Sequence, residues 1–60
     1  MPIITLTMSA LDVEKKRQLA AGFTKVAAES LSIPEEKFIV IFDEKPRESI
    51  AGGGKLLADS

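Results

Sequence analysis

The sequence predicts an α+β fold: one βαβ unit followed by a glycine-rich C-terminal hairpin, in a single domain over residues 1–60. Three observations predict it. An apolar, β-branched run fills residues 3–8, a helical pattern covers residues 13–31, and a second apolar run fills residues 38–42. Because a two-stranded sheet is weak alone and has two open edges, we expect oligomerisation to complete the sheet.

The two predicted strands differ in pattern. Alternate positions of residues 3–8 form one apolar face, whereas residues 38–42 are apolar throughout, which is typical of a strand buried on both faces of a parallel sheet. Residues 50–57 contain three consecutive glycines and are expected to fold back as a short hairpin.

The predicted helix has a recognisable start and end. Asp12 is a suitable N-cap, and Pro34 limits the C-terminal end because the residue before a proline disfavours helical dihedral angles. The apolar stripe recurs at spacings of three and four residues and consists of Leu19, Ala20, Phe23, Val26, Ala27 and Leu31. Lys16 lies near the centre of this stripe, which is unusual for a charged residue.

The composition restricts how so short a chain can be stabilised. A chain of 60 residues buries only about 60% of the surface that its unfolded form exposes. There is no cysteine or histidine, so disulfides and ordinary zinc, copper or haem sites are excluded, and we expect no metal or other cofactor. Association with further copies of the chain is the remaining source of support, and a hydrophobic content of 45% suits it.

The charge balance argues against two classes of partner. Eight basic and nine acidic residues give a formal net charge of −1, and there is no Tyr or Trp to stack on bases, so we expect no nucleic acid. The apolar runs are too short to span a bilayer and no basic and apolar leader opens the chain. We therefore expect a cytoplasmic protein that does not bind membranes.

Three motifs occur in a characteristic order. MPII opens the chain, EKKRQL occupies residues 14–19, and AGGGKL occupies residues 51–56. With this spacing, the chain resembles the 4-oxalocrotonate tautomerase family of small tautomerases over essentially its whole length, and looks closest to divergent archaeal members. The resemblance implies a cofactor-free isomerase and a homohexamer built as a trimer of dimers.

The resemblance also implies that Pro2 is the catalytic base. Once Met1 is removed, Pro2 carries a secondary amine whose ordinary pKa lies slightly above neutrality, and burial in an apolar pocket would lower that pKa. Such an amine can take a proton from beside a carbonyl or dienol of a small carboxylate-bearing substrate and return it elsewhere. The alternative is that Pro2 only promotes removal of Met1 and begins a strand.

Two arginines and an aromatic residue usually complete this family's pocket, and the sequence departs from that pattern. Residues 9–11 contain no arginine, Ile39 aligns with the second arginine, and Ile50 aligns with the aromatic residue. The resemblance therefore implies a pocket lined by Ile39 and Ile50, and it argues against the dicarboxylate substrate typical of the family.

Two cationic residues are candidates to replace these arginines. Lys37 opens the second predicted strand, at a height similar to that of Pro2 in a parallel sheet, and is either an electrophile or a solvated turn lysine. Arg47 precedes the glycine-rich tail and offers a planar fork that suits a carboxylate, or is an ordinary surface arginine.

Lys16 is a third candidate with a structural alternative. A helix between two parallel strands runs antiparallel to them, so its first turn lies near the strand ends. We therefore expect Lys16 to pair with Asp43 or Glu44, with its stem along the core. The other possibility is contact with Pro2 of a neighbouring copy.

The glycine-rich segment is not a phosphate-binding loop, because the spacing of its first glycine is wrong and a leucine replaces the hydroxyl residue. The predicted function is therefore a homo-oligomeric tautomerase acting on a small molecule. A non-catalytic oligomeric binding module with the same fold is the alternative, and addition to an unsaturated acid by Pro2 is a third possibility.

Overall fold

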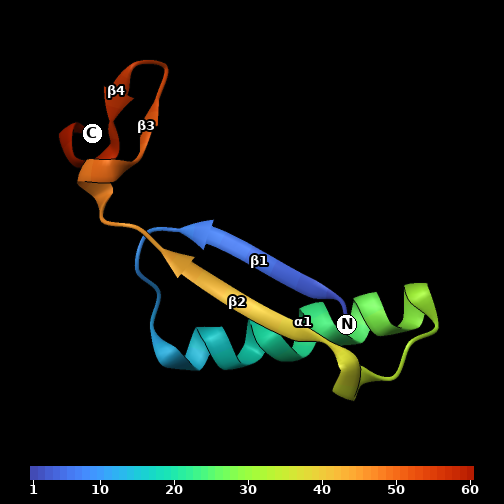
Figure 1. Cartoon of the computed structure of the whole chain (residues 1–60). Coiled ribbons are helices and arrows are strands. Elements are labelled where there is room, and N and C mark those ends of the chain that lie inside the picture. Colours follow the sequence, from blue (N-terminus) through green and yellow to red (C-terminus); the bar gives the residue numbers. More distant parts are fainter.

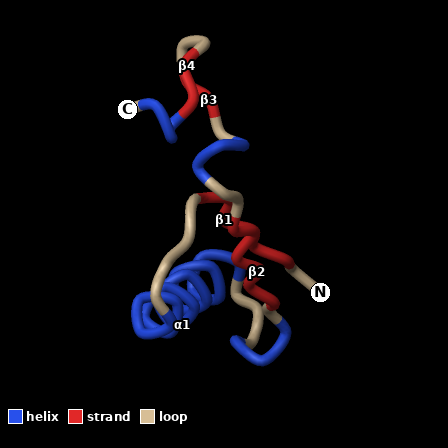
Figure 2. The backbone as a smooth tube through the Cα atoms, turned by 90° about the vertical axis from the view of Figure 1, so that its left-hand side faces the viewer, coloured by secondary structure: helices blue, strands red, loops and turns tan.

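The computed structural model describes residues 1–60 and shows a βαβ unit followed by a small separate hairpin (Figure 1). The helix and strands are β1 (Ile3–Met8), α1 (Val13–Leu31), β2 (Ile39–Glu44), β3 (Ala51–Gly52) and β4 (Lys55–Leu56). β1 and β2 form a parallel two-stranded sheet, and β3 and β4 pair in antiparallel fashion. Figure 2 shows α1 on one side of the sheet only. This architecture confirms the predicted fold class.

α1 begins and ends where local signals predict. The Asp12 carboxylate accepts a hydrogen bond from the Lys15 backbone N–H at 2.9 Å, which satisfies one free donor of the first turn. Ser32 ends the helix with a left-handed backbone, at φ 57°. Pro34 then leads into a single 3₁₀ turn at Glu35–Lys37. α1 does not have the run of apolar residues that a membrane-spanning helix needs.

β2 differs from its prediction at both ends. It begins at Ile39 rather than Phe38, directly after the 3₁₀ turn. It also continues through Asp43 and Glu44, because β1 is long enough to pair with both residues. Backbone pairing with β1 therefore extends β2 beyond the apolar run from which the strand was predicted.

The two faces of the sheet have different environments. Five side chains lie half-buried on the face that α1 covers: Ile4, Leu6, Met8, Val40 and Phe42. On the opposite face, Ile3 is 58% exposed and Ile41 is 44% exposed, and Ile39 is also exposed. The prediction that β2 is buried on both faces is therefore wrong for a single chain, because nothing within the chain covers the second face.

The apolar stripe of α1 is narrower than its periodicity predicts. Val26 is 65% exposed, and Leu31 is also exposed, so neither is covered within the chain. Ala28 is the one buried residue, at 8% exposed, and the chain turns back beside it, where the Ile33 N–H donates to the Ala28 carbonyl at 3.2 Å.

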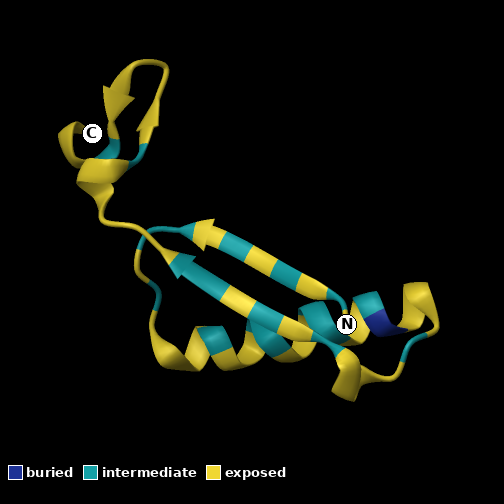
Figure 3. Cartoon of the chain, viewed as in Figure 1, coloured by how far each residue is buried: buried dark blue, intermediate teal, exposed yellow.

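A single chain has no closed core. Figure 3 shows half-buried residues along one face of the sheet and the facing side of α1, and exposed residues almost everywhere else. The radius of gyration is 14.3 Å, whereas a compact domain of this length has roughly 10 Å. The accessible surface is 4453 Å², against roughly 3,800 Å² for a compact protein of this mass.

The C-terminal hairpin extends away from the βαβ unit, beyond the C-terminal ends of β1 and β2 (Figure 1). Gly53 and Gly54 adopt φ values of 61° and 84°, which permit the two-residue turn between β3 and β4. The Leu57 N–H donates to the Ile50 carbonyl at 2.9 Å, and this bond closes the base of the hairpin. The predicted glycine-rich hairpin is therefore confirmed.

Candidate functional site

The sheet separates the predicted site residues into two groups. Pro2, Lys37 and Ile39 lie at the end where both strands begin, and Lys16 and Arg47 lie at the end where both strands finish. Met8, the last residue of β1, lies six residues after Pro2, and a strand rises about 3.3 Å per residue, so the two groups are roughly 20 Å apart. A single chain therefore does not bring its predicted site residues together.

At the first end, Pro2 is held by its carbonyl group. This carbonyl accepts a hydrogen bond from the Ile39 N–H at 3.0 Å, next to the paired residues Ile3 and Ile39. A proline has no N–H to contribute to the ladder, so its nitrogen lies at the margin of the sheet. Ile39 thus lies beside Pro2, as the predicted apolar lining requires.

Lys37 ends the 3₁₀ turn that directly precedes β2, so it lies before the second strand, as predicted. The register keeps it near the height of Pro2, because Ile39 pairs with Ile3. Its side chain is exposed and forms no ion pair within the chain. Lys37 is therefore free to interact with an anionic group near this end of the sheet.

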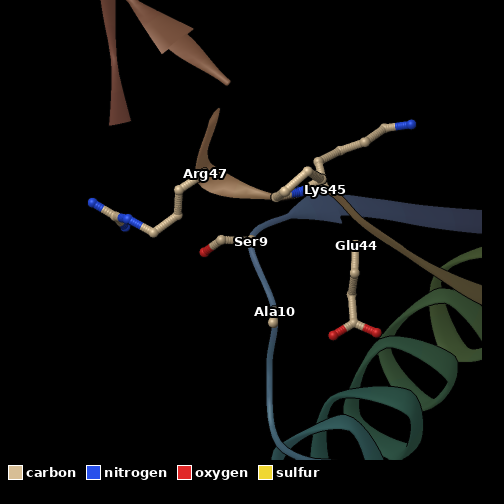
Figure 4. A pocket seen from close by; sticks show the side chains of 6 residues that line it. Ser9, Ala10, Glu44, Lys45 and Arg47 are labelled. Atoms are coloured by element: carbon tan, nitrogen blue, oxygen red, sulfur yellow. The ribbon is translucent and has the colours of Figure 1, made fainter. Parts of the chain in front are cut away.

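At the other end, an open cleft of about 630 Å³ lies between the β1–α1 connector and the chain that leaves β2. Ser9 and Ala10 line one side of it, and residues 44–47 line the other. The Ser9 hydroxyl and the Arg47 guanidinium point to the same side, whereas the Lys45 side chain points away (Figure 4). Polar and charged residues therefore predominate among those that line the cleft.

Glu44 links three segments at this cleft. Its carboxylate accepts a hydrogen bond from the Lys16 ammonium at 2.5 Å and another from the Leu11 N–H at 3.0 Å. The hydrogen bond from Lys16 lowers the pKa of the Glu44 carboxyl most, and the hydrogen bond from the Leu11 N–H lowers it further, so this pKa lies below its ordinary value. The predicted structural ion pair of Lys16 is confirmed, and Glu44 rather than Asp43 is its partner.

The remaining two cations at the cleft differ in their partners. Lys45 lies 3.4 Å from an Asp43 carboxylate oxygen. Arg47 donates from Nη2 to the Leu57 carbonyl at 2.6 Å and pairs with no carboxylate. Arg47 is therefore the cation of the cleft whose charge is not matched by an acidic side chain.

Ile50 joins neither group. It is half-buried where the chain enters the hairpin, and its carbonyl accepts the bond from Leu57. Because the hairpin extends from the end of the sheet opposite Pro2 (Figure 1), Ile50 cannot line a pocket at Pro2 of its own chain.

Comparison with known proteins supports one family. The family model described as "Tautomerase enzyme" matches residues 2–60. The chain belongs to the tautomerase family. A "Probable tautomerase" of Bacillus cereus is 35% identical over 60 residues and covers 98% of each chain.

Solved structures agree with this assignment. DmpI from Archaeoglobus fulgidus is 36% identical, with 97% of this chain and all of that one covered, at a TM-score of 0.91. A 4-oxalocrotonate tautomerase homologue is 34% identical, with 100% and 97% covered, at a TM-score of 0.90. Membership in this family supports an isomerase-type enzyme.

The structure also places at this cleft two residues that the sequence did not single out as site residues, Ser9 and Glu44. The sequence predicts Ser9 only as part of a connector, and Glu44 only as a possible partner for Lys16. Ser9 directly follows β1, and Glu44 is the last residue of β2. Because the two strands are parallel, their C-terminal ends lie at the same edge of the sheet. That topological rule was the available signal.

Proposed function

We propose that this chain is a tautomerase whose general base is the Pro2 amine, freed by removal of Met1. The observation that carries the proposal is that the family match begins at Pro2 and spans the rest of the chain. The surroundings of Pro2 support it, since an apolar neighbour such as Ile39 disfavours the charged form of an amine.

Two copies are needed to complete the site. Residues at the two ends of one sheet are too far apart to act together, but a two-fold axis pairs equivalent strand edges in opposite directions. Such pairing brings Pro2 of one copy beside the cleft of the next and lets a neighbouring hairpin supply Ile50. We propose this arrangement within a homohexamer built as a trimer of dimers.

The exposed apolar face supports association. Ile3, Ile39 and Ile41 form a contiguous apolar surface on the side that α1 leaves open. Covering this face would bury apolar area and supply the core that a single chain lacks.

The proposed reaction is proton transfer on a small enol or ketone. Pro2 takes a proton from one atom of the substrate and returns it to another, so the substrate is isomerised without a co-reactant. Lys37, unpaired and at the same end of the sheet, stabilises the negative charge that develops on the enolate oxygen.

Replacement of Pro2 tests the proposal. Pro2→Ala retains a terminal amine but loses the ring that directs its lone pair, and we expect kcat on phenylenolpyruvate to fall about 10²- to 10⁴-fold. Sedimentation should show an unchanged oligomer. Pro34→Ala, a proline change outside the site, is the matched control and should retain activity.

A non-catalytic binding module with this fold is the second candidate, because isoleucine occupies positions 39 and 50 where the family usually has an arginine and an aromatic residue. Turnover equal to that of buffer in the unaltered protein, or turnover unchanged in Pro2→Ala, would favour this candidate over the enzyme. Acetylation of the terminal amine provides a second check, since it removes the base without altering a side chain.

A further inference from the structure

We propose that the cleft at the C-terminal ends of β1 and β2 binds one carboxylate group of the substrate, through the Arg47 guanidinium and the Ser9 hydroxyl. This inference rests on the proposed function and specifies its substrate class: a small enol or ketone that carries a single carboxylate. Pro2 of a neighbouring copy acts on the part of the substrate that extends from the cleft.

The charges around the cleft identify the binding group. Two of its three cations are matched by acids, since Lys16 pairs with Glu44 and Lys45 pairs with Asp43. Arg47 forms one hydrogen bond, to a neutral backbone carbonyl, and its other donors have no partner within the chain. A guanidinium with free donors offers a carboxylate two parallel hydrogen bonds.

Ser9 supplies a further donor on the same side of the cleft. It directly follows β1, is half-buried, and its hydroxyl forms no hydrogen bond within the chain. Its side chain and that of Arg47 point to the same side, although they come from different segments (Figure 4). A hydroxyl beside a guanidinium can donate a further hydrogen bond to a carboxylate oxygen that the guanidinium already binds.

Glu44 adds no unpaired negative charge to the cleft. Its carboxylate lines the cleft but points toward α1, where Lys16 neutralises it (Figure 4). Through the Leu11 N–H, it also fixes the connector that carries Ser9. One carboxylate is therefore matched by Arg47, whereas a second would find no unpaired cation among the residues that line the cleft.

The test compares phenylenolpyruvate with its methyl ester, which lacks the negative charge. Arg47→Ala should raise KM for the acid about 10- to 100-fold and Ser9→Ala about 3- to 10-fold, because each removes hydrogen bonds to a charged group. Both variants should lose less on the ester than on the acid, because the ester carbonyl still accepts a hydrogen bond but carries no charge. Sedimentation at the size of the unaltered protein shows that they fold. Arg47→Lys, which keeps a charge without the fork, should give an intermediate KM.

Two results would overturn the inference: an unchanged KM for the acid in Arg47→Ala, or turnover of the dicarboxylate enol-oxaloacetate as efficient as that of phenylenolpyruvate. If Pro2 is not the general base, the Pro2→Ala variant will turn over both the acid and the ester as the unaltered protein does. This result is therefore distinct from a failure of the carboxylate site. Calorimetric binding of phenylpropionate to Arg47→Ala needs no turnover. Binding weakened 10-fold or more supports the clamp, and binding equal to that of the unaltered protein contradicts it.

Discussion

Glu44 is the residue at which the strand end, the connector and the helix are joined. The ionised Glu44 carboxylate accepts hydrogen bonds from the Lys16 ammonium and from the Leu11 N–H, and both contacts favour its charged form. Because these contacts lower its pKa in the folded chain, the ionised form stabilises the fold above the unfolded pKa, and this contribution is lost as pH falls through the folded pKa.

Glu44→Gln should therefore remove part of the acid sensitivity of the fold. The unfolding midpoint of the unaltered protein should exceed that of the variant near neutral pH, and the difference should shrink below pH 4.5, the ordinary pKa of a glutamate side chain. Urea unfolding at fixed protein concentration across this range measures it.

Glu14→Gln is the matched control for this prediction. Glu14 pairs with Arg17 at 3.0 Å on the exposed side of α1, where ion pairs contribute little to stability. Its pH profile should follow that of the unaltered protein. A Glu44→Gln profile that also runs parallel to the unaltered one would contradict the role given to Glu44.

Pro2 shows how one covalent change controls the chemistry of a residue. With Met1 attached, its nitrogen is a tertiary amide and can neither accept a proton nor attack a substrate. After removal of Met1, the same atom is a secondary amine, while the carbonyl of Pro2 keeps the residue bonded to Ile39.

At the scale of elements, α1 contains one unfavourable residue. Gly22 lies in the middle of the helix, and a Cβ built there has no atom within 4 Å. Gly22→Ala should stabilise the protein by about 1 kcal/mol, because alanine has the higher helix propensity and meets no obstruction.

Urea unfolding at one protein concentration measures this gain, and Ala21→Gly at the neighbouring exposed position should cost a similar amount. Destabilisation by Gly22→Ala would instead mean that another copy packs closely against this glycine.

Local signals predicted the elements that depend on local interactions. The alternation of β1, the Asp12 cap and the turn glycines each act over a few residues, and the structure confirms all three. The end of β2 was missed, because its charged residues continue the strand only by pairing with β1, and no local pattern records that partner.

The site was less predictable than the fold for a physical reason. Sequence reasoning correctly placed Lys16 beside Glu44, which follows from βαβ topology within one chain. It did not predict that Pro2 and Arg47 lie at opposite ends of the sheet, which is the observation behind the proposed second copy. Ser9 was missed because its free hydroxyl becomes informative only once Arg47 is seen to point to the same side.

At the scale of the whole molecule, the extended shape and the proposed chemistry have the same explanation. A chain with dimensions of 42 × 23 × 15 Å and an open apolar sheet face is built to lie against copies of itself. The same contact that covers Ile3 and Ile41 would bring the base of one copy to the carboxylate clamp of another.

Mixing two inactive variants tests this central claim most directly. Pro2→Ala and Arg47→Ala chains are unfolded together in equal amounts and refolded, and turnover of phenylenolpyruvate is measured well below its KM. If each site takes Pro2 from one chain and Arg47 from another, about a quarter of the sites regain both residues, and activity should rise to about a quarter of the unaltered level. A mixture no more active than the mean of the two variants measured separately would contradict a site shared between copies.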